Sequence, residues 1–337
     1  MAQAEIHHEP FLSGGKVGQY LGVETTLSFS SPIQELEALR SGCAVFELNW
    51  RALIAVTGKD RVRWLHNMVT NNVRDLPLNR GAYNFVLNAQ GRILGDLCVF
   101  NLGESLLLET DRAQVAALLA TLRRFIIMDK VELADRGNEV AAIGVAGPKA
   151  AETLRSAGID VNGLQPLEIQ QRAIGDATVQ VIRGSEQKPD WFELWTDAAH
   201  AGSIAASLTG AGAHPVGAEA LEAWRVLRGI PQYGKDIRDR DLPQETGQLQ
   251  ALSFNKGCYI GQEIVERIRS RGQVHRKFTG FEFSEGAPAV GKFEAGGRAF
   301  AEVTSVVRVP SRAGEHEIGL GYVRVDAVPE NRVLDLN

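Results

Sequence analysis

Short apolar segments of two kinds follow one another along this chain in an irregular order. Strand-like runs occupy residues 53–56, 83–87 and 97–100, whereas apolar residues at helical spacing occur at 61–69 and 113–125. A doubly wound parallel sheet needs a regular alternation of strand and helix, and this order does not provide it. We therefore predict an α+β fold with mixed and antiparallel sheets and helices.

The two ends of the chain differ from its middle. Residues 1–30 are polar and rich in glycine, and we predict a loose arm there. Near the other end, strand-like segments at 278–283, 301–309 and 318–325 are separated by glycine and proline, which predicts a small β-barrel or sandwich. With 337 residues, the chain is long enough for two or three packed domains.

Composition argues against several classes of protein. No uncharged stretch is long enough to span a bilayer, and residues 1–8 lack the features of a signal or transit peptide, so we expect a cytoplasmic protein. A net charge of −5 gives no reason to expect nonspecific nucleic-acid binding. The odd number and wide spacing of the cysteines do not suit a disulfide framework, a zinc site or a permanent iron–sulfur cluster, and we expect no metal. These cysteines are Cys43, Cys98 and Cys258.

The segment 254–267 is the most informative part of the sequence. Gly257 and Gly261 would weaken a core strand, but they suit a tight turn or a close approach of the backbone to a ligand. Helical spacing resumes after Gly261, so we predict a helix whose first turn holds Gln262 and Glu263. Glu263 and Arg267 are four residues apart and can pair along the surface of that helix.

Cys258 lies just before the predicted helix and two residues after Lys256. A cation and a helix N-terminus both lower the pKa of a thiol, which would make Cys258 a nucleophile. The alternative is that Cys258 is a small buried apolar residue, as most free cysteines are. Cys43 and Cys98 lie among apolar neighbours, and we predict both in the core.

The run Asn-Lys-Gly-Cys-Tyr-Ile-Gly-Gln-Glu at 255–263, continued by Arg267, resembles the signature of the YgfZ-type folate-binding proteins. These belong to the aminomethyltransferase superfamily, which includes the T-protein of glycine cleavage. The resemblance extends through nearly the whole chain, with further similar blocks at 56–61, 145–148 and 221–225.

The resemblance implies a three-domain cloverleaf that holds reduced folate, tetrahydrofolate or a one-carbon derivative, in a central channel. The implied domains are a central folate-binding domain (1–55 plus 138–250), an inserted α+β domain (56–137) and a C-terminal β-barrel domain (276–337), with the signature segment (251–275) before the last of these. The implied cofactor-binding residues are Glu193, Arg225, Lys256, Gly257, Tyr259, Gln262, Glu263 and Arg267. The implied catalytic residues are Cys258, Lys256 and Asp96.

Glu193 matches an acid that faces the pterin ring in the T-proteins. A carboxylate suits a pterin because it can accept paired N–H bonds from the ring. The alternative is a strand residue that faces outward, since Phe192 and Leu194 alternate with Glu193 as that would require.

Two departures from the T-protein pattern bear on function. T-proteins carry two adjacent acids where this chain has Gly95-Asp96, and they lack a cysteine at the position of Cys258. Both differences favour a folate-binding accessory protein for iron–sulfur cluster assembly or repair and for iron–sulfur-dependent tRNA modification. Alternatives are a tetrahydrofolate-dependent aminomethyltransferase and a non-catalytic scaffold. Whether the protein is itself a one-carbon transferase is left open.

A basic run without an acidic residue follows the signature from 267 to 277. It could hold the glutamyl tail of folate or contact an anionic partner such as tRNA, and the alternative is a solvated charged surface. Iron–sulfur enzymes or their assembly factors are the other expected partners. The basic residues are Arg267, Arg269, Arg271, Arg276 and Lys277.

Overall fold

The computed structural model describes residues 10–186, 188, 190–283, 290–295, 297–311 and 314–327. The predictions made for residues 1–8 and for the last ten residues of the C-terminal domain therefore lie outside the described residues. The helices are α1 (Pro32–Ser41), α2 (Arg61–Met68), α3 (Arg112–Arg123), α4 (Ala150–Ser156), α5 (Ala198–Gly210), α6 (Ala218–Leu227) and α7 (Gln262–Arg271), with 3-10 turns η1 (Pro243–Glu245) and η2 (Leu249–Ala251).

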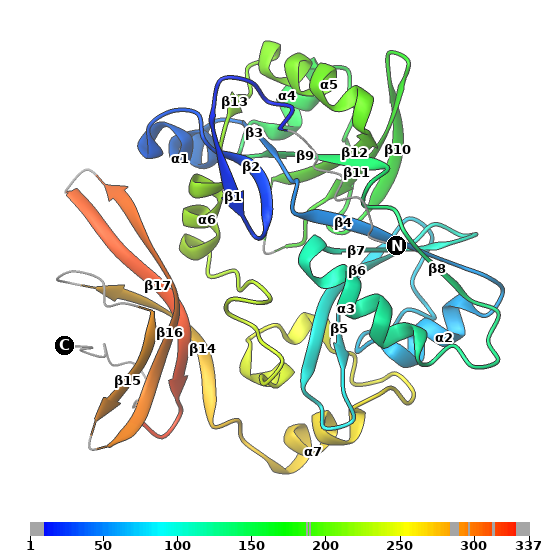
Figure 1. The fold of residues 1–337 in the computed structure, drawn as a ribbon. Coiled ribbons are helices and arrows are strands. Elements are labelled where there is room, and N and C mark those ends of the chain that lie inside the picture. The colour runs from blue at the N-terminus through cyan, green and yellow to red at the C-terminus, as the bar shows by residue number, and fades with distance from the viewer. Residues whose placement is uncertain are drawn as a thin grey trace, which may run out of the picture. The chain divides into compact units, whose positions relative to one another are not determined.

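The strands of the described residues form four sheets (Figure 1). They are β1 (Lys16–Tyr20), β2 (Val23–Ser28), β3 (Ala44–Glu47), β4 (Arg51–Thr57), β5 (Gly81–Leu87), β6 (Ile93–Asn101), β7 (Leu106–Asp111), β8 (Glu132–Asp135), β9 (Val140–Ala146), β10 (Ile169–Ile174), β11 (Ala177–Arg183), β12 (Trp191–Asp197), β13 (His214–Pro215), β14 (Arg276–Phe283), β15 (Gly291–Ala295), β16 (Arg298–Ser311) and β17 (Gly314–Arg324). Strands and helices mix without a regular alternation, so the predicted α+β class is confirmed.

The chain divides into two compact units, each built from three separate segments. Unit 1 comprises Met1–Val62, Asp75–Ala82 and Cys98–Leu221, and unit 2 comprises Arg63–Arg74, Tyr83–Leu97 and Glu222–Asn337. The three-domain division implied by the resemblance stays a prediction.

Unit 1 contains a six-stranded sheet with the order β10-β11-β12-β9-β3-β13. Its strands pair antiparallel except for β13, which runs parallel to β3. Helices α4 and α5 cover one face of this sheet (Figure 1), and alternate residues of the strands point into the core between them. Phe192 and Leu194 of β12 belong to this core, which places Trp191, Glu193 and Trp195 on the opposite face.

The N-terminal region forms the β1–β2 hairpin, so the prediction of a loose arm over residues 1–30 is wrong for the part that the structure describes. The cause is the buried carboxylate of Glu47 in β3. It accepts hydrogen bonds from the backbone N–H groups of Leu12, at 2.7 Å, and Thr26, at 3.1 Å. A charged acceptor makes strong hydrogen bonds when it is buried, and these bonds fix a segment that has little apolar pattern of its own.

The second sheet that contributes to unit 1 has five strands in the order β5-β6-β7-β4-β8. Its strands β7, β4 and β8 belong to unit 1 and pair antiparallel. Cys98, at the start of the part of β6 that belongs to unit 1, is half-buried, whereas we predicted it in the core. The alternation along β6 turns Leu97 and Val99 inward and leaves Cys98 between them.

Unit 2 contains a four-stranded antiparallel sheet with the order β14-β17-β16-β15. The strands predicted at 278–283, 301–309 and 318–325 are therefore present. Strands β14 and β15 are the outer strands of this order, and no pairing between them closes the sheet within the described residues. The C-terminal barrel stays a prediction.

Gly144 offers a test of the packing on the Glu193 face of the six-stranded sheet. It pairs with Phe46 across β3 and β9, and an added Cβ would come within 1.8 Å of the fully buried Phe46 ring. We expect Gly144→Ala to lower the free energy of unfolding by about 1–3 kcal/mol, because overpacking forces the neighbours to move. Thermal unfolding measures this change.

The control is Gly210→Ala at the end of α5, where an added Cβ meets no atom within 4 Å. There we expect no loss of stability, because alanine favours a helix over glycine by about 0.5–1 kcal/mol. Equal losses in the two variants would contradict the packing described for Gly144.

Candidate functional site

The signature segment leads into α7 through Gly261, as predicted. Gly261 is the N-cap of α7 and has a φ of +82°, a conformation that favours glycine. A Cβ at this position would lie 2.6 Å from the backbone oxygen of Asn88, so the close approach also requires glycine. Gly257 differs, because an added Cβ there would meet nothing within 4 Å.

Lys256 is buried, with 8% of its surface exposed, and it closes the end of α2. Its ammonium donates to the backbone carbonyls of His66, Val69 and Asn71, at 2.5, 2.6 and 2.7 Å. The last carbonyls of a helix have no partner within the helix, and an ammonium has three N–H donors to offer them. Burial, and to a lesser extent Arg74, lower the pKa of Lys256 to about 7.

This arrangement directs every N–H of the Lys256 ammonium at the backbone. A second hydrogen bond also joins the signature segment to α2: the backbone N–H of Ile260 donates to the backbone oxygen of Asn67, at 3.2 Å. The geometry is therefore that of a structural cap that fastens the signature segment to α2. The catalytic and cofactor-binding roles implied for Lys256 stay predictions.

Two neighbours of Lys256 in the signature have opposite environments. Cys258 is exposed, so the alternative of a small buried residue is wrong. Tyr259 is buried, its ring lies 5.0 Å from the Lys256 ammonium, and its hydroxyl has no hydrogen-bond partner in the described residues. Burial, followed by the charge of Glu266, raises the pKa of Tyr259 to about 12.

The polar residues of α7 lie near or at the surface. Gln262 is half-buried, and Glu263 and Arg267 are exposed. The predicted pair between Glu263 and Arg267 is absent from the part of the chain that the structure describes, where Glu266 pairs with Arg269 instead, at 3.6 Å. Exposed pairs of this kind contribute little, so either arrangement is available to the side chains.

Arg225 has partners for all of its guanidinium N–H groups. It forms ion pairs with Glu222, at 2.6 Å, and with the fully buried Asp236, at 2.5 Å. It also donates to the backbone oxygen of Ile230 and to the hydroxyl of Ser305. The cofactor-binding role implied for Arg225 stays a prediction, and the contacts found are internal to unit 2.

Asp96 of β6 accepts a hydrogen bond from the hydroxyl of Tyr83, at 2.6 Å. Tyr83 lies on β5 and packs against the apolar cluster that includes Tyr259. The contact fixes one carboxylate oxygen of the residue that we predicted as catalytic.

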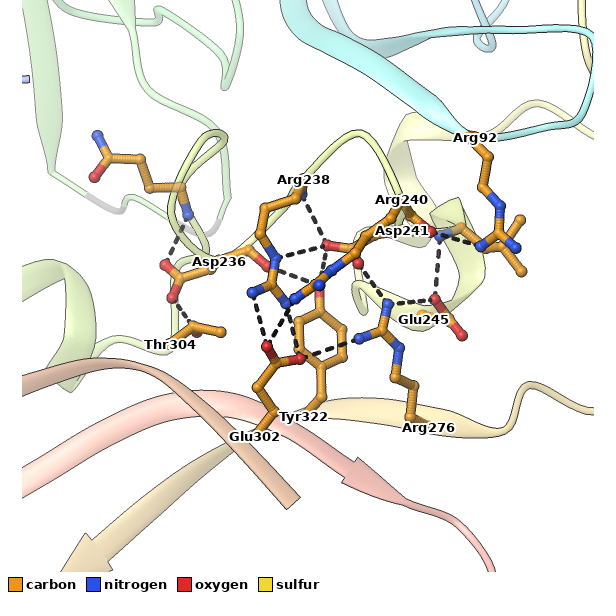
Figure 2. Close-up of polar contacts among 12 residues, drawn as sticks. Arg92, Asp236, Arg238, Arg240, Asp241, Glu245, Arg276, Glu302, Thr304 and Tyr322 are labelled. Atoms are coloured by element: carbon orange, nitrogen blue, oxygen red, sulfur yellow. Dashed lines mark hydrogen bonds and ion pairs between the residues drawn. The ribbon is translucent and has the colours of Figure 1, made fainter. Parts of the chain in front are cut away.

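The basic run after the signature is only partly available to a ligand. Arg276 forms ion pairs with Asp241, Glu245 and Glu302, and Figure 2 shows these acids in one network with Arg238 and Arg240. The carboxylate of Glu302 also forms ion pairs with the guanidinium groups of Arg238, at 2.9 Å, and Arg240, at 2.8 Å. The network joins the segment around 236–245 to β14, β16 and β17, so Arg276 has a structural role. Arg267 and Lys277 are exposed.

Glu193 is buried in unit 1, with 6% of its surface exposed, so the alternative of an outward-facing residue is wrong. The indole N–H of Trp191 donates to its Oε1, at 3.1 Å, whereas Oε2 has no partner in the described residues. The guanidinium of Arg51 is close enough to interact electrostatically with Glu193. Burial alone would lower the pKa of Arg51, but the negative charges of Asp111 and then Glu193 outweigh burial and raise this pKa.

Aromatic residues that the sequence did not single out lie on the same face of the sheet as this carboxylate. The rings of Phe46 and Trp191 lie 4.7 Å apart, and Trp195 follows Glu193 on the same face of β12. The aromatic composition of the segment 191–195 was the available signal, but periodicity alone could not show which face would be covered.

Within the described residues, no group of three or more His, Cys, Asp or Glu side chains is arranged to hold a metal ion. None of the helices in the same residues combines the length and the apolar character needed to cross a membrane.

Comparison with known proteins identifies the family. The sequence model described as the GCVT N-terminal domain matches residues 6–256, and the chain belongs to this family. An aminomethyltransferase of Geobacillus kaustophilus is 28% identical over 96% of this chain and 91% of its own length. A chloroplast protein of Arabidopsis thaliana, named as a transferase, is 26% identical over 94% of this chain and 72% of its own length.

A solved structure supports the same fold. The glycine cleavage system aminomethyltransferase T from Bartonella henselae superimposes with a TM-score of 0.81 at 23% identity, over 93% of this chain and 87% of its own chain. At this identity the likeness establishes the fold alone. The mixed α+β architecture is thus shared with this aminomethyltransferase.

Lys256 can be tested as a structural cap. We expect Lys256→Met to lower the free energy of unfolding by about 1–3 kcal/mol, because carbonyls at the end of α2 lose their partner while they stay buried. Urea unfolding measures the change. Lys277→Met, an exposed lysine on β14 of the same unit, is the control and should change little. Equal losses of stability in Lys256→Met and Lys277→Met would contradict the role of Lys256 as a structural cap.

Proposed function

We propose that this protein binds a reduced folate, tetrahydrofolate or a one-carbon derivative, and that Glu193 accepts N–H groups of the pterin ring. The observation that carries the proposal is the buried Oε2 of Glu193, which has no partner in the described residues. A buried carboxylate oxygen without a hydrogen bond costs free energy that a ligand N–H would recover. Membership of the GCVT family supports the choice of folate.

The residues around Glu193 fit a flat ring with N–H groups. The bond from Trp191 holds the carboxylate in place while it leaves Oε2 for the ligand. Phe46 and Trp191 offer aromatic surface of the kind that lines small-molecule sites. Bound tetrahydrofolate would supply the chemistry of one-carbon transfer, and this chain would bind and orient it.

Aminomethyl transfer is the reaction that the comparisons favour. Relatives from Symbiobacterium thermophilum and Geobacillus kaustophilus that are similar over more than nine-tenths of this chain are named aminomethyltransferase. In this chain Asp96 would act on the transferred group, and the bond from Tyr83 would hold its carboxylate in one orientation. A positioned carboxylate is suited to proton transfer.

A second candidate function rests on Cys258. It is exposed in a segment that Lys256 fastens to α2, so its thiol is presented on a fixed backbone. Together with the resemblance to the YgfZ-type signature, this favours a folate-binding accessory protein for iron–sulfur enzymes, including those that modify tRNA. Arg267, exposed on α7, would then contact an anionic partner such as tRNA. A cytoplasmic location belongs to the same proposal.

Replacing Glu193 tests folate binding. We expect Glu193→Gln to weaken the binding of tetrahydrofolate about tenfold or more, because a hydrogen bond to a charged acceptor becomes one to a neutral amide. Calorimetry under anaerobic conditions measures the dissociation constant. Glu152→Gln, an exposed acid on α4, should bind as the unchanged protein does. Unaltered binding by Glu193→Gln would contradict the proposed contact.

Two substitutions separate the candidate reactions. If the protein transfers an aminomethyl group, Asp96→Asn should abolish formation of methylene-tetrahydrofolate from an aminomethyl-lipoyl carrier, whereas Cys258→Ala should not. If it serves iron–sulfur enzymes, Cys258→Ala should lower the activity of those enzymes in cells. Absence of product from the unchanged protein would exclude the transferase, and unchanged enzyme activities in the Cys258→Ala cells would exclude the second candidate.

A further inference from the structure

Two buried polar groups on the same face of β12 have no hydrogen-bond partner in the described residues. One is Oε2 of Glu193, an acceptor, and the other is Nε1 of Trp195, a donor. The two residues are 6% and 3% exposed. Buried polar atoms are nearly always paired, so one unpaired acceptor and one unpaired donor so close in sequence call for an explanation.

The neighbouring strands, as far as the structure describes them, form no hydrogen bond with either group. In the pairing of β12 with β9, Glu193 lies opposite Gly144 and Trp195 lies opposite Ala142, and neither of these has a polar side-chain atom. Trp191 is engaged with the other oxygen of the carboxylate, Oε1. On β11 the residue opposite Glu193 is Ile182, which is also apolar, and the residue opposite Trp195 is Gln180. Gln180 and the nearby Arg51 are polar, but neither forms a hydrogen bond with Nε1 of Trp195 or Oε2 of Glu193. A ligand on this face is therefore the natural partner of both groups.

Side chains two residues apart on a strand share a face and start roughly 7 Å apart, so two long side chains can converge on one flat ligand. The ligand that satisfies both groups presents an N–H to the carboxylate and, close beside it, an acceptor to the indole N–H. A cyclic amide has this pattern, because its ring N–H and its carbonyl are adjacent.

We propose that Trp195 donates a hydrogen bond to the 4-carbonyl of the pterin ring while Glu193 accepts the adjacent ring N–H. The proposal rests on the folate-binding function proposed above and adds a residue that determines specificity. Glu193 and Trp195 together select 4-oxopteridines. An uncharged 4-amino ring, as in a 2,4-diaminopteridine, places an amino donor beside the donor of Trp195 and an acceptor nitrogen beside the carboxylate of Glu193, so it is disfavoured. A site built to pair with one polar group rejects a ligand that lacks it.

The experiment compares tetrahydrofolate with its 4-amino analogue by calorimetry, in mildly alkaline buffer where the diaminopteridine ring carries no proton. We expect the unchanged protein to bind the 4-oxo ligand at least about tenfold more tightly than the 4-amino ligand. The 4-oxo ligand gains a hydrogen bond from Trp195, whereas the 4-amino ligand leaves the buried indole N–H of Trp195 unpaired. In Trp195→Phe, the 4-oxo ligand should bind more weakly and the 4-amino ligand should not, so the preference narrows. The preference that remains belongs to Glu193, because the uncharged 4-amino ring also lacks the N–H that Glu193 accepts. Quenching of tryptophan fluorescence gives a second readout.

The control is Trp224→Phe, a tryptophan of α6 whose ring lies under Arg228. It should keep the preference for the 4-oxo ligand. Equal binding of the two ligands by the unchanged protein would overturn the role of Trp195 without any variant, as would an unaltered preference in a folded Trp195→Phe protein. If neither ligand binds the unchanged protein, the folate-binding function fails as well.

Discussion

The buried ammonium of Lys256 is the interaction on which the signature segment depends. Its three bonds to carbonyls at the end of α2 join two parts of the chain that are about 190 residues apart in sequence. An ammonium is strongly hydrated, so burying it is costly unless its donors are all used, and here they are. With Lys256 fixed, Tyr259 is held in the interior and Cys258 is held at the surface.

Polar groups in this protein divide into those that fasten segments together and those that stay unpaired. Glu47 fastens the β1–β2 hairpin, Arg225 and Asp236 fasten α6 to the segment after it, and the network around Glu302 fastens β16 to residues 236–245. Glu193 and Trp195 are also buried, but each keeps one polar atom without a hydrogen-bond partner in the described residues. Since burial without pairing is unfavourable, these two residues are where a ligand would be expected.

Much of the local structure was predictable. Apolar periodicity located the strands around 83–87 and 191–195, and the glycine at 261 indicated the start of α7, because few other residues adopt a positive φ at a close approach. The hairpin before residue 30 was not predictable, because its position depends on a carboxylate in β3. The pairing partner of Arg269 was also unpredictable, since exposed ion pairs differ little in free energy.

Local patterns in the sequence were enough to predict the α+β class, many of the strands and helices and the family resemblance carried by residues 255–263, because periodicity, turn chemistry and a motif are local properties. The sequence also identified Glu193 and Lys256 as residues to examine. The folded structure was needed to show that Lys256 caps a helix, that Glu193 is buried and that Trp195 lies buried beside it. Alternation along a strand assigns residues to two faces, but whether a face is covered depends on elements distant in sequence.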